Sequence, residues 1–402
     1  MQQCLSHPTR GYYMNPENSV FGAEGDFITS PEITQMFGEL IAVWLISQYH
    51  ALGKELPLRI VELGPGKGTL MGDILRVVLQ FIPKRTINVH LVETSLSMRA
   101  TQKAHLESAN HPNVHLHWHN SINDLSSSST EYTMLVAHEF FDALPIHILK
   151  KAENNTWHEV LVASTAEEKP QTESDSAESN ATSQPAASTS ESTSSFRYVL
   201  APQPTPISTV LGLSSPRFNE LPTGSTLEVS PTSFRIARKV GELLATGSAE
   251  EELSIGGAGL IIDYGANHAF DNSLRAFQNH KIVDPFHAPG TADLTANVDF
   301  AYLSEAMADL VATHGPLDQR DFLHGMGLPI RLQGLMQRAA TQAERERLWG
   351  AAFRLVDKEG MGGQYRVLGV TGRRAAEGES GVEGGGPVWP FVSHPDVEAR
   401  TE

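Results

Sequence analysis

The stretch VELGPGKGTL, at residues 61–70, decides the fold that this sequence predicts. Residues 58–63, which overlap the start of this stretch, are mostly apolar, and this is typical of a buried strand. After the glycines, residues 69–81 space their apolar side chains as a helix does, and Pro83 ends that helix. The sequence therefore predicts a strand, a glycine loop and a helix, the opening unit of a Rossmann-like fold.

Three glycines alternate in this loop, and one acidic residue precedes them. Gly64, Gly66 and Gly68 give the pattern G-x-G-x-G, whereas a dinucleotide loop follows G-x-G-x-x-G and directs a helix N-terminus at pyrophosphate. Glu62 would repel a phosphate here but suits the ammonium group of S-adenosylmethionine. We therefore expect these four residues to bind S-adenosylmethionine.

A second acidic residue, Glu93, ends the next expected strand, at residues 89–93. A carboxylate at this place in a Rossmann sheet can accept hydrogen bonds from both ribose hydroxyls. NAD-dependent enzymes share this feature. Glu93 is therefore expected to bind the cofactor, but it does not distinguish S-adenosylmethionine from NAD. A nucleotide-dependent oxidoreductase and a methyltransferase-like fold without catalysis remain as alternatives.

Strands and helices continue to alternate along the chain, which indicates βαβ units and a mainly parallel sheet. The predicted fold class is α/β, a Rossmann-like class I S-adenosylmethionine-dependent methyltransferase with helical additions and a disordered insertion. We expect a late edge strand at residues 365–372. The other expected strands lie at residues 114–118, 133–137, 158–163, 225–229 and 259–263, and the other helices at 33–49, 95–109 and 232–244.

The length of 402 residues exceeds what one hydrophobic core usually supports, so we expect additions to the catalytic domain. Residues 164–195 contain almost no large apolar side chain, too few to offset the entropy of ordering. The expected division is an N-terminal segment covering the cofactor site (1–58), a cofactor-binding core (59–163), a disordered insertion (164–195), the rest of the sheet with the substrate cleft (196–372) and a flexible tail (373–402).

The segment HEFFDALP, at residues 138–145, follows the strand expected at 133–137. Parallel strands end at the same edge of a sheet, so this segment is expected to face the same crevice as the glycine loop. Glu139 and Asp142 could pair with a cationic acceptor, because carboxylates match a guanidinium bidentately. The alternative is a pair of acids that stabilises a helix N-terminus.

Two further loops carry acidic residues. GAEGDFITSPEI, at residues 22–33, contains Asp26, which we expect to close over the cofactor. PGTADLTANVDF, at residues 289–300, adds Asp293 and Asp299. Neither loop, taken alone, is specific for one function.

Composition narrows the possible partners. The formal net charge of −17 opposes a broad phosphate-binding face, so we expect no nucleic-acid partner. Cys4 is the only cysteine, which excludes intramolecular disulfides and cysteine metal clusters. His115, His117 and His119 would share one strand face, but no nearby carboxylate or cysteine completes a metal site, and we expect no metal. No apolar run approaches the length of a membrane span.

Together, several segments resemble the mitochondrial MidA-like family, the complex I assembly factor 7 type of protein arginine methyltransferase. The resemblance covers about residues 1–370. The family usually has asparagine before EFFDALP, where this chain has His138. The segments that carry the resemblance are GDFITSPEITQMFGELIAVW, VELGPGKGTLMGDILR, HEFFDALP, EVSP and PGTADLTANVDF.

The resemblance implies symmetric dimethylation of an arginine on the 49-kDa-type core subunit of respiratory complex I, in the mitochondrial matrix, during assembly. It also implies that the cofactor binds at the glycine loop and Glu93, with the HEFFDALP segment beside it. A matrix protein carries a cleavable basic presequence, whereas this chain begins almost at the family motif. We therefore expect the N-terminus of this sequence to be truncated.

Two rival functions remain open. One is a methyltransferase that acts on a small molecule or on another protein side chain; a closed aromatic pocket would favour a small acceptor and a long acidic groove a peptide. The other is an assembly chaperone that binds S-adenosylmethionine without essential catalysis. A folded but catalytically dead variant would separate the chaperone from the enzyme.

Overall fold

The computed structural model describes residues 1–15, 28–53, 55–83, 85–108, 111–165, 195–247, 254–373 and 388–392. It divides into two compact units, each described by itself below. The first unit combines Met1–Ile146 with Leu227–Glu402, and the second is His147–Thr226. Asp26 and most of the Ser-rich insertion expected from the sequence lie outside the described residues.

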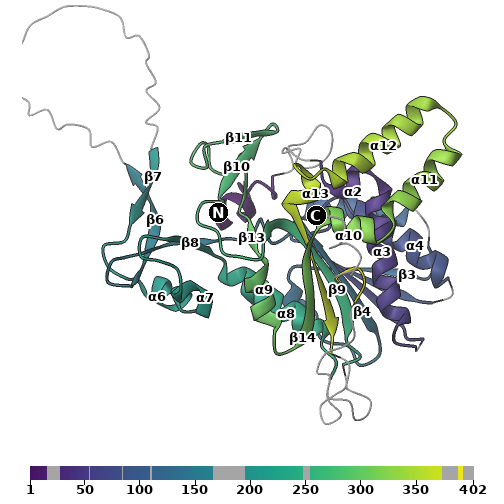
Figure 1. Cartoon of the computed structure of the whole chain (residues 1–402), viewed down its shortest axis with the longest axis horizontal. Helices are drawn as coiled ribbons and strands as arrows, with labels where there is room; N and C mark the ends of the chain where they lie inside the picture. Colours follow the sequence, from purple (N-terminus) through teal and green to yellow (C-terminus); the bar gives the residue numbers. More distant parts are fainter. Residues whose placement is uncertain are drawn as a thin grey trace, which may run out of the picture. The chain divides into compact units, whose positions relative to one another are not determined.

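A mainly parallel sheet forms the centre of the first unit (Figure 1). Its order is β14-β15-β9-β4-β1-β2-β3, with β13 paired to β9. The strands from β9 to β3 are parallel neighbours, whereas β15 runs antiparallel to β9 and to β14. The strands are β1 (Leu58–Leu63), β2 (Ile87–Val92), β3 (Val114–His119), β4 (Tyr132–His138), β9 (Gly257–Ala266), β13 (Val298–Asp299), β14 (Val311–Asp318) and β15 (Tyr365–Gly372).

The chain leaves β1 towards β2 on one side and later returns to β4 on the other side. The sheet therefore reverses its strand order between β1 and β4, and open α/β sheets bind ligands at the carboxyl ends of such strands. The predicted α/β fold class with a Rossmann-like sheet is confirmed.

Each face of the sheet is covered by helices because apolar residues occupy both faces of the parallel strands. On β1, Leu58 and Ile60 pack with α3 (Gln35–His50) and α4 (Thr69–Phe81). The next apolar residues, Val61 and Leu63, pack with α8 (Pro231–Leu244) and α9 (Phe300–Met307). This alternation fixes which side of the sheet each residue at the strand ends can reach.

A small antiparallel sheet and several short elements complete this unit. The small sheet has the order β11-β10-β12, and α1 contacts β12. The elements are α1 (Gln2–Ser6), α2 (Ser30–Ile33), α5 (Leu96–Glu107), η1 (Ile122–Asp124), β8 (Thr226–Val229), β10 (Arg275–Gln278), β11 (Lys281–Val283), β12 (Asp293–Thr295), α10 (Gln319–Gly325), α11 (Leu328–Arg338), α12 (Gln342–Val356) and α13 (Met361–Gln364).

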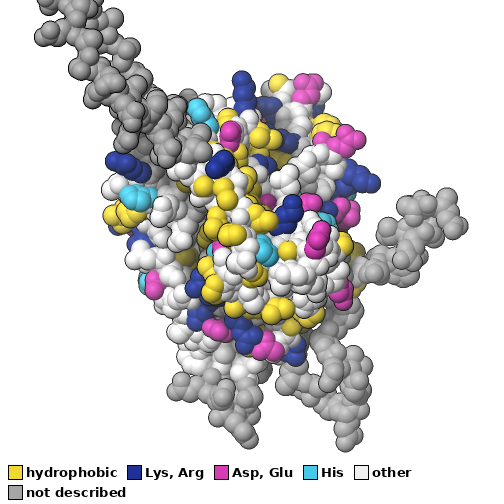
Figure 2. Space-filling view, turned by 90° about the vertical axis from the view of Figure 1, so that its left-hand side faces the viewer, with side chains coloured by type: hydrophobic (Ala, Val, Ile, Leu, Met, Phe, Trp, Pro, Cys, Tyr) yellow, Lys and Arg dark blue, Asp and Glu magenta, His cyan; other side chains and the backbone are white. Residues whose placement is uncertain are grey.

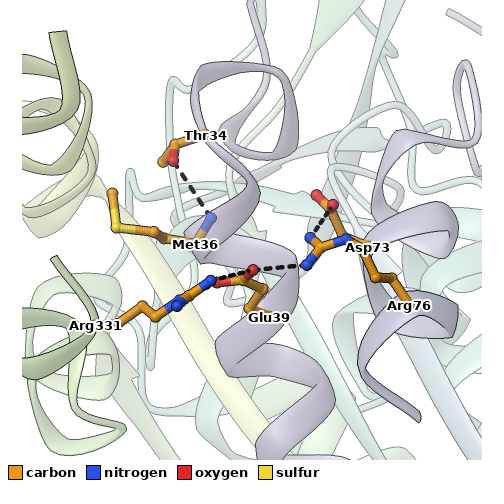
Figure 3. A network of polar contacts seen from close by, with 6 residues as sticks. All are labelled: Thr34, Met36, Glu39, Asp73, Arg76 and Arg331. Atoms are coloured by element: carbon orange, nitrogen blue, oxygen red, sulfur yellow. Dashed lines mark hydrogen bonds and ion pairs between the residues drawn. The ribbon is translucent and has the colours of Figure 1, made fainter. Parts of the chain in front are cut away.

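One buried carboxylate links α3, α4 and α11, as Figure 3 shows. Glu39 accepts hydrogen bonds from Arg331 Nε at 2.6 Å and from Arg76 Nη1 at 2.8 Å. Arg76 Nη2 also donates to Asp73 Oδ1 at 2.7 Å. Burial alone would raise the pKa of Glu39, but the hydrogen bonds from the two arginines lower it below its usual value. The ionised Glu39 therefore stabilises this helix packing.

The second unit contains an antiparallel sheet of β5 (His147–Lys151), β6 (Trp157–Thr165) and β7 (Ser195–Leu200). Two short helices follow, α6 (Pro206–Gly212) and α7 (Pro216–Asn219). Thr165 pairs with Ser195, so residues 166–194 connect adjacent strand ends. Residues 164, 165 and 195, which the sequence-based division placed in the insertion, belong to these strands.

Two expectations from the sequence are corrected. Residues 365–372 form β15 as expected, but β14 pairs beyond it and is the edge strand. The β14 strand has a register shift between His314 and Leu317, where Gly315 and Pro316 hide the strand pattern. The helix expected at 33–49 is α3, which starts at Gln35 because the Thr34 hydroxyl accepts from the Met36 N–H.

The flexible tail expected at 373–402 does not hold for residues 388–392. The Trp44 indole donates to the Trp389 carbonyl at 3.0 Å, and the Trp389 indole donates to the Gly325 carbonyl at 3.0 Å. Phe391 packs edge-on against Trp44. Phe391 packs on the core and Trp389 is fixed by two hydrogen bonds, although the composition around them is typical of a disordered segment.

The exposed surface mixes charged and apolar side chains. In Figure 2, hydrophobic side chains gather near the middle of the face, with Lys and Arg around them. Among the helices of the described residues, none is long and apolar enough to span a membrane. Within the same residues, no cluster of His, Cys, Asp and Glu has the arrangement of a metal site.

Candidate active site

A cavity of about 350 Å³ lies at the carboxyl ends of β1, β2 and β4, where the fold predicts a ligand. Gly64 and Gly66 follow β1, Glu93 follows β2, and Glu139 follows β4. The cavity therefore brings together three loops that are separate in the sequence. Other lining residues include Tyr13, Met98, Ser121, Ile122, Phe140, Asp142, Tyr264, Phe277, Asp293 and Thr295.

The glycine loop depends on conformations that other residues adopt only with strain. Gly64 has φ of 63° and Gly66 has φ of 51°, and both line the cavity. A Cβ on Gly64 would lie 2.9 Å from Phe140 Cδ2, which is too close. Gly68, with φ of 85°, precedes the first residue of α4 and does not line the cavity. Its place supports a role in turning the chain into the helix.

Glu93 is linked to the glycine loop by a side chain that the sequence analysis missed. Gln102 Nε2 donates to the Gly66 carbonyl at 2.8 Å and to Glu93 Oε2 at 3.2 Å. The other oxygen, Oε1, accepts from the Ser95 N–H at 2.7 Å. Burial raises the pKa of Glu93, partly offset by these hydrogen bonds. Its carboxylate is held rigidly while it lines the cavity.

Glu62 lies elsewhere than the sequence argument assumed. It shares the α3 side of β1 with Ile60, is 3% exposed and does not line the large cavity. It lines a second cavity of about 50 Å³ with Gly66, His138 and Glu139. Burial raises the pKa of Glu62 to about 8. Without a bound cation this group is therefore mostly uncharged at neutral pH, and a cation beside it would favour the ionised form.

The turn at residues 139–142, here named the carboxylate turn, places two acids at the cavity. Tyr365 Oη donates to Glu139 Oε1 at 2.9 Å. Burial, followed by the charge of Asp142, raises the pKa of Glu139 to about 8. Burial raises the pKa of Asp142 to about 6, and its buried Oδ1 has no hydrogen-bond partner among the described residues. These two groups can change protonation near neutral pH.

Further residues shape the same site. Tyr13 Oη donates to Asp293 Oδ1 at 2.7 Å, so the N-terminal segment forms part of the cavity wall. Asp299 instead accepts from the Tyr302 N–H and caps α9. His138 packs against Phe37 with ring centroids 5.1 Å apart, and burial lowers its pKa to about 3. His138 is therefore neutral and does not line the large cavity.

Sequence reasoning missed Asp263, Tyr264 and Tyr365 as site residues. Asp263 and Tyr264 lie near the carboxyl end of β9, a buried strand parallel to β4. An acidic residue near the end of an apolar strand was the available signal, as it had been for Glu93. Tyr365 gave no such signal, because β15 reaches the site from the opposite direction.

The cavity residues fit S-adenosylmethionine. The Glu93 carboxylate has lone-pair positions beyond those used by Ser95 and Gln102, so it can also accept from a ribose hydroxyl. Met98 and Ile122 line the same cavity as Glu93 and would suit the apolar face of a purine ring. Gly64 and Gly66 leave backbone exposed for the amino-acid part of the cofactor. The sheet topology and this cavity define a class I S-adenosylmethionine-dependent methyltransferase.

The chain belongs to the Methyltransf_28 family of S-adenosyl-L-methionine-dependent methyltransferases, whose model matches residues 40–317. It is therefore an enzyme of this class, and S-adenosylmethionine is its cofactor. The expected resemblance to the MidA-like arginine methyltransferase family is confirmed by the relatives that follow.

Curated relatives extend over most of the chain. The zebrafish (Danio rerio) protein named protein arginine methyltransferase NDUFAF7, mitochondrial, is 36% identical over 389 residues, covering 92% of this chain and 82% of the relative. The human (Homo sapiens) protein of the same name is 32% identical over 413 residues, covering 98% and 83%.

A solved structure supports the fold. It is a likely methyl transferase of the COG1565 superfamily from Burkholderia thailandensis, bound to S-adenosyl-homocysteine. The TM-score is 0.69 at 20% identity, with 92% of this chain and 86% of that chain covered. At this identity the likeness shows the shared fold.

Proposed function

We propose that this enzyme methylates the guanidinium group of an arginine side chain in a protein. The observation that carries the proposal is a pair of carboxyl groups, the half-buried Glu139 and the buried Asp142, that line the cavity beside the glycine loop. The arginine methyltransferase names of relatives over most of the chain support the same acceptor.

The carboxylate turn suits a guanidinium for two reasons. Ionised carboxylates pair with a guanidinium through charge-assisted, often bidentate hydrogen bonds, and Asp142 Oδ1 has an unused buried acceptor position. Transfer of a cation from water into a buried site is unfavourable unless such partners compensate for the lost hydration. Binding of the cation would in turn favour the ionised forms of Glu139 and Asp142, whose pKa values burial has raised to about 8 and about 6.

Different residues would bind the cofactor, bind the acceptor and accept the proton. When bound, S-adenosylmethionine supplies an electrophilic methyl group. Glu93 and the glycine loop would hold the cofactor, while Glu139 and Asp142 hold the acceptor nitrogen in place. The guanidinium nitrogen must lose a proton as it is alkylated, and Glu139, with its raised pKa, is suited to accept that proton.

The finer proposal names the acceptor and the product. By the family resemblance, the acceptor is an arginine on the 49-kDa-type core subunit of respiratory complex I, and the product is symmetric dimethylarginine. The reaction would take place in the mitochondrial matrix, which agrees with the word mitochondrial in the names of the relatives. We further propose that the methylation serves assembly of that complex.

Mass spectrometry of the complex I subunit tests this proposal. The purified subunit is incubated with S-adenosylmethionine and the full-length enzyme, and then its arginine-containing peptides are analysed. We expect a dimethylated arginine with wild type and much less of it with Glu139→Gln over the same reaction time. Unmodified arginine despite normal cofactor binding would reject this acceptor. Normal complex I assembly in cells that carry folded but inactive Glu139→Gln would favour a chaperone.

A further inference from the structure

The carboxylate turn is held by an acidic side chain that does not itself reach the cavity. Asp263, on β9, is 0% exposed. Its Oδ1 accepts from the Tyr264 N–H at 2.9 Å. Its Oδ2 accepts from three consecutive backbone N–H groups, those of Phe140 at 3.2 Å, Phe141 at 2.9 Å and Asp142 at 3.2 Å.

The turn needs such support because its backbone is strained. Glu139 has φ of 49°, in the left-handed region that residues with a side chain seldom adopt. Such conformations persist only where the surrounding structure determines them. The Glu139 N–H donates to the Ile262 carbonyl at 3.0 Å, so β9 fixes the start of the turn and Asp263 fixes the rest.

We propose that Asp263 is a positioning residue for methyl transfer, because its carboxyl group holds the backbone that presents Glu139 and Asp142 to the acceptor. This inference rests on the proposed function, in which those two residues bind the guanidinium group of the acceptor. Asp263 does not line the cavity, so it would act only through the carboxylate turn.

The role depends on an oxygen acceptor rather than on charge. Burial, followed by the negative charges of Asp142 and Glu139, raises the pKa of Asp263 well above its usual value. In the neutral acid one oxygen still accepts from the three N–H groups. Asparagine keeps one oxygen for the three N–H groups of the turn, although its NH2 group cannot accept from the Tyr264 N–H; alanine leaves all four N–H groups without this partner.

The test compares Asp263→Ala with Asp263→Asn in the full-length enzyme. S-adenosylmethionine affinity is measured by calorimetry, and kcat and KM are measured with the 49-kDa-type subunit as acceptor. We expect Asp263→Ala to lower kcat about a hundredfold, the scale for a small misplacement of a reacting group. Cofactor affinity should stay within about threefold, and Asp263→Asn should recover most of kcat, since it keeps the acceptor oxygen.

Glu39→Gln is the matched control, because Glu39 is another buried carboxylate with several hydrogen bonds but lies in the helix packing of Figure 3. We expect it to lower the melting temperature while kcat stays near wild type. Equal loss of cofactor binding and kcat in Asp263→Ala would overturn the positioning role. So would an Asp263→Asn enzyme as slow as Asp263→Ala.

Hydrogen exchange tests the same inference without any acceptor. In the wild-type enzyme, the amides of residues 140–142 should be strongly protected, and Asp263→Ala should speed their exchange selectively. Fast exchange in wild type would contradict the inference even if the alanine variant does not fold. If these amides are protected but no protein arginine is methylated, the proposed function fails and the structural role of Asp263 stands.

Discussion

Glu93 has both carboxylate oxygens fixed from within the protein, by the Ser95 N–H and by Gln102. A side chain fixed in this way loses little further entropy when it binds a ligand. Gln102 also holds the Gly66 carbonyl, so one residue of α5 aligns two parts of the expected cofactor site. The ribose and the amino-acid part of the cofactor are therefore expected to bind to prearranged groups.

Glu93→Ala should weaken S-adenosylmethionine binding by about 1–3 kcal/mol, the range for loss of a charged hydrogen-bond partner. Calorimetry measures this difference directly. Glu107→Ala, at the exposed end of α5, is the control and should bind as wild type. Unchanged affinity in Glu93→Ala would instead remove Glu93 from the expected cofactor site.

Residues at the ends of strands could be predicted from the sequence only in part. The positions of Glu93, Glu139 and Asp142 follow from the rule that parallel strands end at one edge. Glu62 was harder, because one position along a strand decides which side of the sheet a residue faces. The alternation on β1 places Glu62 with Ile60 on the α3 side, away from the large cavity.

At the scale of elements, the glycine loop contains two kinds of glycine. Gly66 borders both cavities, whereas Gly68 borders neither and begins the turn into α4. Both have positive φ, so the conformation alone does not separate ligand contact from chain direction. Substitution can separate them.

Gly66→Val should abolish S-adenosylmethionine binding, because a branched side chain would fill the cavity and strain the loop. Gly68→Ala should bind the cofactor but lose roughly 1–2 kcal/mol of unfolding free energy, the scale for a left-handed non-glycine residue. Calorimetry and chemical denaturation measure the two effects. Normal affinity in a folded Gly66→Val enzyme would remove this loop from the cofactor site.

Elements with regular patterns were predicted well, whereas short or interrupted ones were missed. The sequence predicted the helix at residues 69–81 because its apolar spacing is strong, and α4 has those bounds. It missed β10 to β12, which are only three or four residues long. It also missed α10 to α13, including the 15 residues of α12, because few of their side chains are buried.

At the scale of the whole molecule, the Ser-rich stretch connects β6 and β7 in the second unit. Thr165 and Ser195 are already paired, so a short turn can join the two strands. Replacement of residues 166–194 by Asn-Gly should keep S-adenosylmethionine affinity and change the melting temperature by less than about 4 °C, which corresponds to less than about 1 kcal/mol. Scanning calorimetry would contradict this if the melting temperature fell strongly.

The carboxylate turn is where the acceptor is expected to bind. Asp142→Asn and Glu139→Gln keep the size of each side chain and remove its charge. Cofactor affinity should therefore change little, while methyl transfer falls. An equal loss of binding and turnover in both variants would instead indicate that the acids are structural.

The most direct measurement is the pH dependence of kcat/KM for wild type and Glu139→Gln with the complex I subunit as acceptor. Burial raises the pKa of Glu139 to about 8, so its ionised fraction grows as the pH rises through that value. Wild-type kcat/KM should rise over the same interval, and Glu139→Gln should be slow without that rise. Full activity and an unchanged pH profile in Glu139→Gln would contradict the account.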